Sequence, residues 1–454
     1  MKNNRRDFIR KATIGASALA AGLPAFASVT GSTDEEMQNS SAFENKGQRF
    51  NMCGYAAPKI ETVRVGVIGL GMRGSDAVER LSYIDGLEIT ALCDKYPDRV
   101  AKSQQALEKM KRPRAKEYSG EEGWKALCDS NDVDLIYSPT PWHLHTPIGL
   151  RGMRNGKHVA LEVPAGKTMD ELWELVETSE KTKKHCMMLE NCCYDFFELL
   201  TLNMARQGLF GELVHVEGAY IHDLTKDWTF NKKAYADMWR LKENIGQNGN
   251  LYPTHGLGPV AQCLDINRGD KFDHMVSMSS NDFTMNNMAK DLAAKDDFFK
   301  EYVDKPYRGN MNTTLIKTNK GKTVMVQHDV SSLRPYSRIH LVSGTKGAAQ
   351  KWPGPERIAF GHSWIKKEEL DNLYKKYSPP IVNHIGAIAK EVGGHGGMDF
   401  IMDWRLIDCL RNGLPLDQDV YDAASWSCLF PLSQRSVAKK SRTVDIPDFT
   451  RGAW

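Results

Sequence analysis

The chain has 454 residues, of which 41% are hydrophobic and 26% are charged, and its formal net charge is +3 at pH 7. This length suits two domains with an ample core. The nearly balanced charge does not favour nucleic acid or an anionic membrane as a partner.

The first predicted element is an export signal. Arg5 and Arg6 precede the apolar run ATIGASALAAGLPAFA, which ends in the A-x-A motif at Ala25–Ala27. A basic start, a short apolar run and this ending are typical of a cleavable signal peptide, and paired arginines indicate twin-arginine export, which moves folded proteins. The alternative is a membrane anchor, but the run is too short and too rich in Gly and Ala. We expect residues 1–27 to be removed and the rest, with a net charge near −1, to reach the periplasm without membrane attachment.

The cysteines argue against a disulfide framework. There are nine, an odd number, and they are scattered along the chain with Cys192 and Cys193 adjacent. Folding in the reducing cytoplasm before export would explain this pattern. The sequence has no CxxC or HExxH motif, and His143 and His145 lie on a predicted loop without an evident third ligand, so we expect no metal site.

Two domains are predicted after a linker or N-terminal arm over residues 28–59. Within residues 60–190, β-rich apolar runs alternate with helical patterns, which indicates a parallel sheet with crossover helices. The predicted strands are Arg64–Gly69, Glu88–Cys93, Leu135–Ser138, His158–Val163 and Cys186–Glu190, and the predicted helices are Gly74–Ser82, Arg99–Met110, Pro147–Asn155 and Met169–Lys181. Residues 191–454 contain longer alternating segments with turn glycines at Gly321 and Gly347. They predict an α/β domain with a large, mostly antiparallel, open sheet.

A glycine loop follows the first predicted strand. Gly69, Gly71 and Gly74 form G-x-G-x-x-G between VRVGVI and a predicted helix. This context is typical of a dinucleotide site, in which the pyrophosphate lies at the helix N-terminus. Asp94 ends the next strand and would accept hydrogen bonds from ribose hydroxyls, which favours NAD over NADP. The alternative is NADP, because three basic residues that could bind its 2′-phosphate lie close by in the sequence: Arg73, Lys95 and Arg99.

At this point the sequence resembles a known family. The segments VIGLGMRG, LCD, PTPWHLHTPIGL, ALEVPAG and GGHGGMDF are similar to the oxidoreductases that include glucose–fructose oxidoreductase and inositol 2-dehydrogenase. The segments NMCGYAAPK, PWHLH, EVP, NCCY and YPTHGLGP resemble the NAD-dependent α-N-acetylgalactosaminidases of glycoside hydrolase family 109. The resemblance extends from about Asn51 to near the C-terminus, and it implies a Rossmann domain followed by an α/β domain whose open sheet walls the active site.

One difference from the broad family is informative. Its dehydrogenases usually carry Glu-Lys-Pro where this chain has Glu162-Val163-Pro164, and that lysine helps to deprotonate the alcohol. Val163 cannot move a proton. The narrower family shares the valine, so the difference favours the glycosidase.

The resemblance also implies roles for individual residues. The predicted cofactor-binding residues are Gly69, Gly71, Met72, Arg73, Gly74, Asp94, Trp142, His143, Leu144, His145, Glu162, Val163 and Asn191. The predicted sugar-binding residues are Tyr220, Arg240, Tyr252, Pro253, Thr254, His255 and Tyr336, and the catalytic candidates are Tyr252, His255 and Tyr336. The residues themselves agree, because a rigid Gly- and Pro-flanked loop would display a His that exchanges protons near neutral pH and a Tyr that donates one. We leave His395 out of the catalytic set and expect Glu391 and Asp399 to be structural.

The implied activity is the removal of terminal α-linked N-acetylgalactosamine from a glycan or glycoconjugate. NAD⁺ would oxidise C3, the C2 hydrogen and the aglycone would be lost, water would add, and the hydride would return, so no pair of carboxylates is required. A cofactor restored in every turnover needs no external supply, which suits an exported protein. The alternatives are an exported sugar oxidoreductase with tightly bound nicotinamide and a non-catalytic sugar-binding protein. By resemblance alone, a homo-oligomer built on the second domain's sheet is expected.

Overall fold

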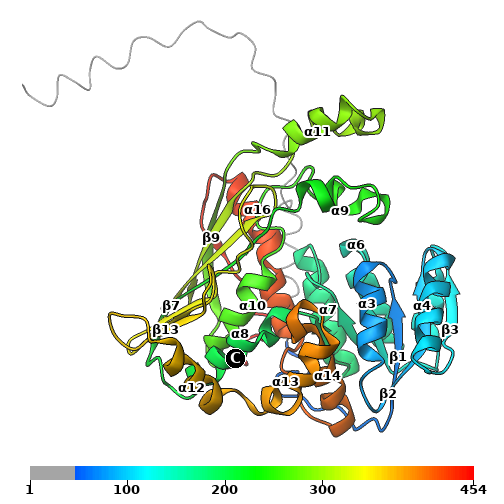
Figure 1. Ribbon diagram of the computed structural model, residues 1–454, viewed down its shortest axis with the longest axis horizontal. Coiled ribbons are helices and arrows are strands. Elements are labelled where there is room, and N and C mark those ends of the chain that lie inside the picture. Colours follow the sequence, from blue (N-terminus) through cyan, green and yellow to red (C-terminus); the bar gives the residue numbers. More distant parts are fainter. Residues whose placement is uncertain (1–46) are drawn as a thin grey trace, which may run out of the picture. The chain divides into compact units, whose positions relative to one another are not determined.

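The computed structural model describes residues 47–454, so the export signal predicted over residues 1–27 lies outside the described range. The first part of this range forms a six-stranded parallel sheet in the order β3-β2-β1-β4-β5-β6 (Figure 1). Its strands are β1 (Val63–Ile68), β2 (Leu87–Asp94), β3 (Lys116–Ser119), β4 (Leu135–Ser138), β5 (His158–Leu161) and β6 (Cys186–Met188). This is the strand order of a Rossmann dinucleotide-binding fold, which confirms the predicted fold class.

Helices connect these strands, as the alternating pattern predicts. They are α3 (Met72–Leu81), α4 (Pro97–Lys109), α5 (Gly123–Asp129), α6 (Trp142–Arg154) and α7 (Met169–Thr182). The sequence pattern misses β3 and α5, which are four and seven residues long and carry little apolar periodicity. It also starts α6 five residues late and so leaves His143 and His145 in a loop. Both lie in the first turn of α6, and the loop assignment is wrong.

The second sheet has eight strands in the order β13-β12-β11-β7-β10-β9-β8-β14. The strands are β7 (Leu213–Ile221), β8 (Phe272–Ser279), β9 (Asn312–Thr318), β10 (Thr323–Asp329), β11 (Leu341–Gly344), β12 (Ala348–Gln350), β13 (Arg357–Ala359) and β14 (Val444–Asp445). Only the β7–β10 pair is parallel. The mostly antiparallel open sheet is therefore confirmed, with Gly321 and Gly347 in the β9–β10 and β11–β12 turns.

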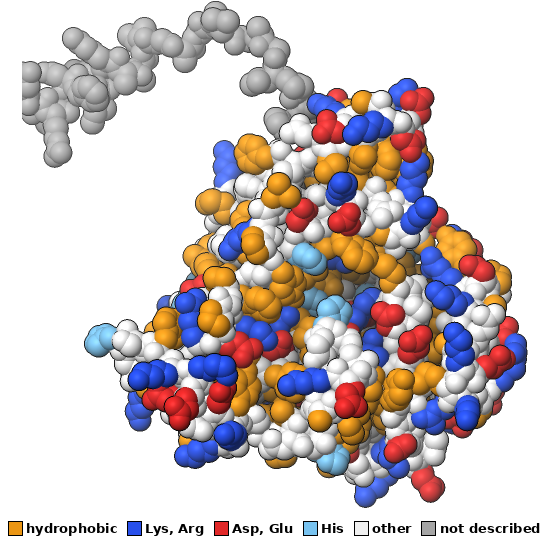
Figure 2. Space-filling model, viewed as in Figure 1, with side chains coloured by type: hydrophobic (Ala, Val, Ile, Leu, Met, Phe, Trp, Pro, Cys, Tyr) orange, Lys and Arg blue, Asp and Glu red, His pale blue; other side chains and the backbone are white. Residues whose placement is uncertain are grey.

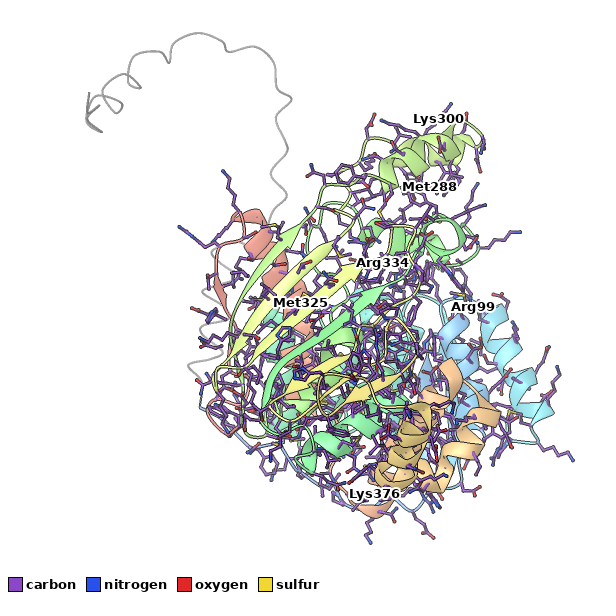
Figure 3. All side chains as sticks on the ribbon, turned by 60° about the vertical axis from the view of Figure 1, so that its left-hand side comes forward. Arg99, Met288, Lys300, Met325, Arg334 and Lys376 are labelled. Atoms are coloured by element: carbon purple, nitrogen blue, oxygen red, sulfur yellow. The ribbon has the colours of Figure 1, made fainter. Side chains whose placement is uncertain are left out.

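Helices and short helical turns complete this part of the chain. They are η1 (Asn191–Tyr194), α8 (Phe196–Arg206), η2 (Thr225–Thr229), η3 (Ala236–Met238), α9 (Trp239–Glu243), α10 (Thr254–Cys263), α11 (Met285–Ala293), η4 (Asp297–Tyr302), α12 (Lys367–Tyr377), α13 (Pro380–Val392), η5 (His395–Gly397), α14 (Met398–Asn412), α15 (Val420–Ser427) and α16 (Leu429–Ala438). Helices α8, α10 and α16 lie on the sheet side that faces the Rossmann sheet (Figure 1). On β10, Val324 and Val326 are buried on the inner face of the sheet. Met325 lies between them, pairs with Glu217 and is on the opposite, open face (Figure 3).

Helices near the C-terminus pack against the Rossmann part of the chain and so connect the two halves of the described structure. Helix α14 packs against α3 and β1, and α15 packs against α7. On α14, Asp403 accepts hydrogen bonds from Arg80 of α3 and from the Tyr137 hydroxyl of β4. The described part of the N-terminal arm is anchored on α15, where the Tyr421 hydroxyl accepts a hydrogen bond from the Met52 amide.

All nine cysteines are free thiols, and eight of them are buried, as the scattered pattern predicts. Among residues 47–454, no helix is both long enough and apolar enough to cross a bilayer.

Candidate active site

The glycine loop between β1 and α3 has the geometry of a phosphate-binding turn. Gly69 adopts a φ of +96°, which favours glycine, and a Cβ at Gly74 would lie 1.8 Å from the Gly69 carbonyl oxygen. The close approach of these two backbones brings the start of α3 against β1. A Cβ at Gly71 would meet only the Arg99 guanidinium, at 3.6 Å, so the space over the N-terminus of α3 is open.

Asp94, at the end of β2, closes one side of this loop. Its carboxylate accepts hydrogen bonds from the Leu70 and Tyr96 amides, at 2.7 and 2.9 Å. Each oxygen keeps a lone pair that a ribose hydroxyl could use. Arg99 lies 3.7 Å from the same carboxylate and balances its charge.

Arg73 joins the glycine loop to the second half of the chain. Its guanidinium binds the Glu162 carboxylate and the Asp399 carboxylate, each at 2.7 Å. Asp399 also accepts hydrogen bonds from Asn191 and is paired with His395. These charges hold the Asp399 pKa well below its usual range, although burial alone would raise it. Arg73, Glu162 and Asn191 are thus brought together, and Asp399, expected to be structural, is the residue that joins them.

The first turn of α6 lies beside this network. Trp142 is buried, Leu144 is partly buried and His143 is exposed. His145 is fully buried, and its two ring nitrogens contact the Thr140 and Pro164 carbonyl oxygens at 2.8 and 2.7 Å. His145 therefore fixes the turn that carries Val163, and both of its nitrogens are occupied by these contacts.

The central pair of the site is His255, in the first turn of α10, and Glu190, which caps the start of η1. A Cβ at Gly218 of β7 would lie 2.0 Å from the Gly256 carbonyl oxygen, so only glycine lets α10 approach the sheet this closely. His255 Nδ1 lies 2.8 and 3.0 Å from the two oxygens of the buried Glu190 carboxylate. The charge of His255 lowers the Glu190 pKa, against the effect of burial. Since a carboxylate only accepts hydrogen bonds, Nδ1 carries a proton and Nε2 is left to exchange one.

Aromatic rings surround His255. The Tyr220 and Tyr252 ring centroids lie 5.2 and 4.8 Å from the imidazole centroid, and the Tyr252 ring stacks on Trp142 at 5.9 Å. The Arg240 guanidinium lies 4.8 Å from the Tyr252 ring centroid and donates to the Tyr235 hydroxyl at 3.3 Å. Pro253 and Thr254 are buried at the start of α10 and shape the turn between Tyr252 and His255. The space-filling view shows a hollow in this face of the molecule, with histidine and apolar side chains around it (Figure 2).

Tyr336 completes this wall, 6.2 Å from Tyr220 between ring centroids. Its hydroxyl accepts a hydrogen bond from Arg338, at 2.9 Å. Burial raises the pKa of Tyr336 and Tyr252, and it raises the pKa of Tyr220 to about 12. All three phenols therefore keep their protons at neutral pH and can donate them.

Among the described residues, one group of three side chains is close enough together to coordinate a metal ion. Ligand atoms of Glu190, Cys192 and His255 lie within 4.8 Å of one another. The Glu190 carboxylate is already bonded to His255, and burial together with the nearby carboxylates raises the Cys192 pKa, which disfavours the thiolate that a metal needs. The geometry favours proton transfer over metal binding.

A bridge crosses from the Rossmann half to the segment that carries Arg240. The Asp237 carboxylate contacts the Lys95 amine at 3.2 Å and the Tyr96 hydroxyl at 3.1 Å. Lys95 and Tyr96 are the two residues that follow Asp94. At the other end, Lys167 binds Glu243 at 2.8 Å. The segment that carries Arg240, residues 237–243, is thus held at both ends by the Rossmann half.

Sequence reasoning misses Glu190, Asp237 and Arg338 as members of this site. Glu190 ends a predicted strand, and its position directly before the NCCY segment is the one sequence feature that could have indicated its role. Asp237 and Arg338 have no local pattern, because the charged partners that hold them, such as Lys95 and Glu198, lie 140 or more residues away. The predicted YPTH loop is also corrected, since His255 lies in the first turn of α10.

Both halves of the chain match known protein families. Residues 63–190 match the oxidoreductase family with an NAD-binding Rossmann fold, and residues 194–454 match the C-terminal domain of glycosyl hydrolase 109. The chain is 46% identical, over 96% of both chains, to glycosyl hydrolase family 109 protein 1 of Bacteroides fragilis. It is 48% identical to an alpha-N-acetylgalactosaminidase of Bacteroides fragilis, over 89% of this chain and 96% of that protein.

Solved structures share the fold at low identity. A levoglucosan dehydrogenase in complex with NADH and levoglucosan has a TM-score of 0.64 at 17% identity, over 85% of this chain and all of that one. The aldose-aldose oxidoreductase of Caulobacter crescentus has a TM-score of 0.59 at 18% identity, over 85% of this chain and 99% of that one. The chain belongs to glycosyl hydrolase family 109, a family of glycosidases, and its N-terminal part has the NAD-binding Rossmann fold of the oxidoreductase family.

Proposed function

We propose that this protein removes terminal α-linked N-acetylgalactosamine by a redox-neutral cycle that uses bound NAD. The observation that carries the proposal is the Glu190–His255 pair among three protonated phenols, beside a glycine loop for a dinucleotide. The relative named alpha-N-acetylgalactosaminidase supports the choice of sugar. Val163 supports a glycosidase, because its buried apolar side chain replaces the lysine of the related dehydrogenases.

The residues around the glycine loop fit NAD. The open space over Gly71 would take the pyrophosphate at the start of α3, and the Asp94 carboxylate would accept from the ribose hydroxyls. Bound NAD⁺ supplies hydride acceptance from C3 of the sugar and its return at the end of the cycle.

The side chains of this chain would move the protons. Once C3 is a carbonyl, the C2 hydrogen is acidic, and His255 Nε2 is held by Glu190 to accept it. The C2–H electron pair forms the C1=C2 double bond, and the C1–O pair leaves with the aglycone oxygen. Tyr336 would give that oxygen its proton, because the phenol accepts from Arg338 and keeps its own proton to donate. Tyr252 and Arg240 would hold the sugar and stabilise negative charge that develops on its oxygens.

One experiment tests the proposal. The purified protein is incubated in deuterated water with a chromogenic α-N-acetylgalactosaminide and no added cofactor. Hydrolysis with deuterium at C2 of the released sugar is expected. An oxidised sugar would instead support a sugar oxidoreductase, and binding without turnover a non-catalytic sugar-binding protein.

We also propose that the protein is exported already loaded with NAD. The basis is the twin-arginine pattern of residues 1–27 together with a cycle that consumes no cofactor. Replacing Arg5 and Arg6 with lysine should retain the protein in the cytoplasm, and cell fractionation measures this.

A further inference from the structure

Arg308 is a buried cation without an anionic partner. Its side chain is 1% exposed. Among the described residues, no carboxylate forms an ion pair with its guanidinium, and Nη2 has no hydrogen-bond partner. Burial lowers the pKa of Arg308 to about 10, so the side chain keeps its charge at neutral pH. Burying an unpaired charge destabilises a fold, so hydrogen bonding alone does not explain why an arginine stands here.

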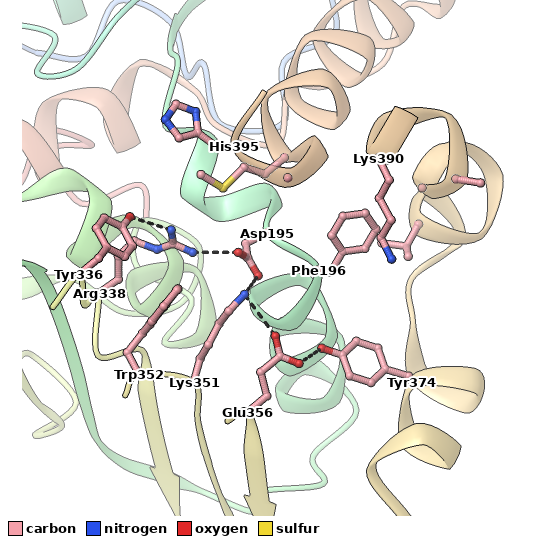
Figure 4. A pocket seen from close by; sticks show the side chains of 15 residues that line it. Asp195, Phe196, Tyr336, Arg338, Lys351, Trp352, Glu356, Tyr374, Lys390 and His395 are labelled. Atoms are coloured by element: carbon pink, nitrogen blue, oxygen red, sulfur yellow. Dashed lines mark hydrogen bonds and ion pairs between the residues drawn. The ribbon is translucent and has the colours of Figure 1, made fainter. Parts of the chain in front are cut away.

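Arg338, another buried arginine at the sugar site, is paired as expected. Its guanidinium binds the carboxylates of Asp195 and Glu198, at 2.9 and 3.0 Å. Figure 4 shows its contact with Asp195 and its hydrogen bond to the Tyr336 hydroxyl. Two carboxylates thus account for the charge of Arg338, whereas none accounts for that of Arg308.

The hydrogen bonds of Arg308 lead to Arg240. Nε of Arg308 donates to the Asn244 side-chain oxygen at 2.9 Å, and its backbone amide donates to the Asn244 carbonyl oxygen at 3.0 Å. The Asn244 side-chain amide donates in turn to the Arg240 carbonyl oxygen, at 2.7 Å. Nη1 of Arg308 donates to the carbonyl oxygens of Gly309 and Asn310, which fixes the guanidinium in its own loop. One side chain, Asn244, therefore links Arg308 to Arg240.

Helix α9, which carries Arg240, needs support from outside. It has five residues, and its N-cap residue, Met238, has a φ of +53° and makes no side-chain capping bond. A helix of this length is unstable on its own. The loop that carries Arg308 holds the end of α9 through Asn244, and the Gly246 amide donates to the Pro306 carbonyl oxygen at 2.8 Å. The position of Arg240 therefore depends on this loop.

The charge of Arg308 also lies on the sugar side of the sheet. His328 pairs with Tyr220 across β10 and β7, and their rings stack at 6.4 Å between centroids. Burial, and then the charges of Arg308 and Arg240, hold the pKa of His328 well below its usual range. Among the described residues, neither arginine is paired with a carboxylate. Together they give this side of the site a positive potential, which favours negative charge on sugar oxygens.

We propose that Arg308 is a positioning residue for the reaction and acts on the sugar through Arg240. It fixes the backbone that carries Arg240 by way of Asn244, and its unpaired charge adds to the potential that Arg240 presents. This inference rests on the proposed function and adds to the sugar-binding residues a buried residue behind them.

The test is a double-mutant cycle between Asn244 and Arg240. It compares kcat/KM on a chromogenic α-N-acetylgalactosaminide, with the NAD content of each variant measured alongside. Asn244→Ala should lower kcat/KM about two- to tenfold, the range for one lost hydrogen bond. In an Arg240→Gln background the same change should lower it less than about twofold, because the link then leads to no guanidinium. Equal losses in both backgrounds would overturn the proposal.

Arg308→Lys and Arg308→Met separate the charge from the packing. The two new side chains have similar lengths, so a purely structural role gives equal losses. We expect Arg308→Lys to keep a kcat about fivefold or more above that of Arg308→Met, with KM values within about twofold, as for a group that stabilises the transition state. Equal kcat values would overturn the proposal. If Arg308→Met does not fold, the Asn244 cycle decides alone.

Asn155→Ala is the matched control. Asn155 is the C-cap residue of α6, as Asn244 is of α9, and its side-chain amide also donates to the carbonyl oxygen four residues earlier, at 3.0 Å. Its loss should leave kcat/KM unchanged.

The same variants distinguish failure of this inference from failure of the proposed function. If the unmodified protein cleaves no glycoside, the proposed function fails, and the cycle is repeated with the Kd for N-acetylgalactosamine, measured by calorimetry. Weaker binding in Asn244→Ala, with no further weakening in the Arg240→Gln background, would keep the link from Arg308 to Arg240. Equal weakening in both backgrounds, or none, would overturn it.

Discussion

Replacing Glu190 with glutamine probes the proton-transfer pair directly. Glu190 has no exposed side-chain surface, and its two oxygens lie 2.8 and 3.0 Å from His255 Nδ1. Glutamine has nearly the same shape and can accept one of these hydrogen bonds, but it carries no charge to stabilise the imidazolium. A hydrogen bond to a charged group contributes about 1.5–3 kcal/mol, so we expect kcat to fall roughly 10- to 150-fold.

The assay follows both hydrolysis and deuterium incorporation at C2, which should slow together because the same base serves both. Glu180→Gln is the control, because Glu180 is another buried carboxylate, bonded to Tyr421 and Arg451 away from the site, and its loss should leave kcat unchanged. If Glu190→Gln kept C2 exchange within twofold of the unmodified protein, His255 could not be the base that Glu190 holds.

The Glu190–His255 pair, the glycine loop and the Asp237 bridge give three further predictions. The pKa of Glu190 is lower in the folded protein than the ordinary value of 4.5. The ionised carboxylate therefore stabilises the fold above pH 4.5, and this stabilisation is lost as the pH falls through the folded-state pKa. In urea unfolding, Glu190→Gln should lose less stability in acid than the unmodified protein. Gly74→Ala would push a Cβ against the Gly69 carbonyl oxygen, so the protein should purify with little NAD, measured by extraction and absorbance. A Gly361→Ala control, at a glycine with open space around it and no positive φ, should keep its NAD. Lys95→Glu and Asp237→Lys should each speed NAD release on dilution by about two- to fivefold, as expected for an exposed ion pair, and the double variant should restore the slow release; unchanged release in both single variants would show that the bridge does not retain the cofactor.

The fold is predictable from the sequence where local patterns are strong. The strand and helix rhythm of the first half and the alternating runs of the second half give the correct fold class. Apart from the missed β3 and α5, the errors lie at two helix starts, α6 and α10. Pro141 and Pro253 are the N-cap residues, and neither makes a side-chain capping bond. Rules that look for Ser, Thr, Asp or Asn at a helix start therefore read both segments as loops.

The site is less predictable, because its parts are joined by contacts that are distant in the sequence. Arg73 meets Asp399 across 326 positions, and His255 meets Glu190 across 65. A carboxylate such as Asp399 in GGHGGMDF looks structural until its partner is known. Resemblance to a family supplies the residues that face a ligand, whereas the charged partners behind them emerge only from the fold.

The carboxylates around the sugar site bear on the mechanism. Most glycosidases that work by direct displacement use two carboxyl groups that face the glycosidic bond. Among the described residues that wall the site, the acidic groups are already bonded to other side chains: Glu162 to Arg73, Glu190 to His255, Asp399 to Arg73 and Asn191, and Asp195 to Arg338 and Lys351. The groups left to exchange protons include His255 Nε2, the phenols of Tyr220, Tyr252 and Tyr336, and the imidazole of His222, whose ring centroid lies 5.2 Å from that of Tyr336. An imidazole with neutral phenols suits the removal of an acidified C–H proton and the protonation of a leaving oxygen, which is the chemistry that a redox-neutral elimination requires.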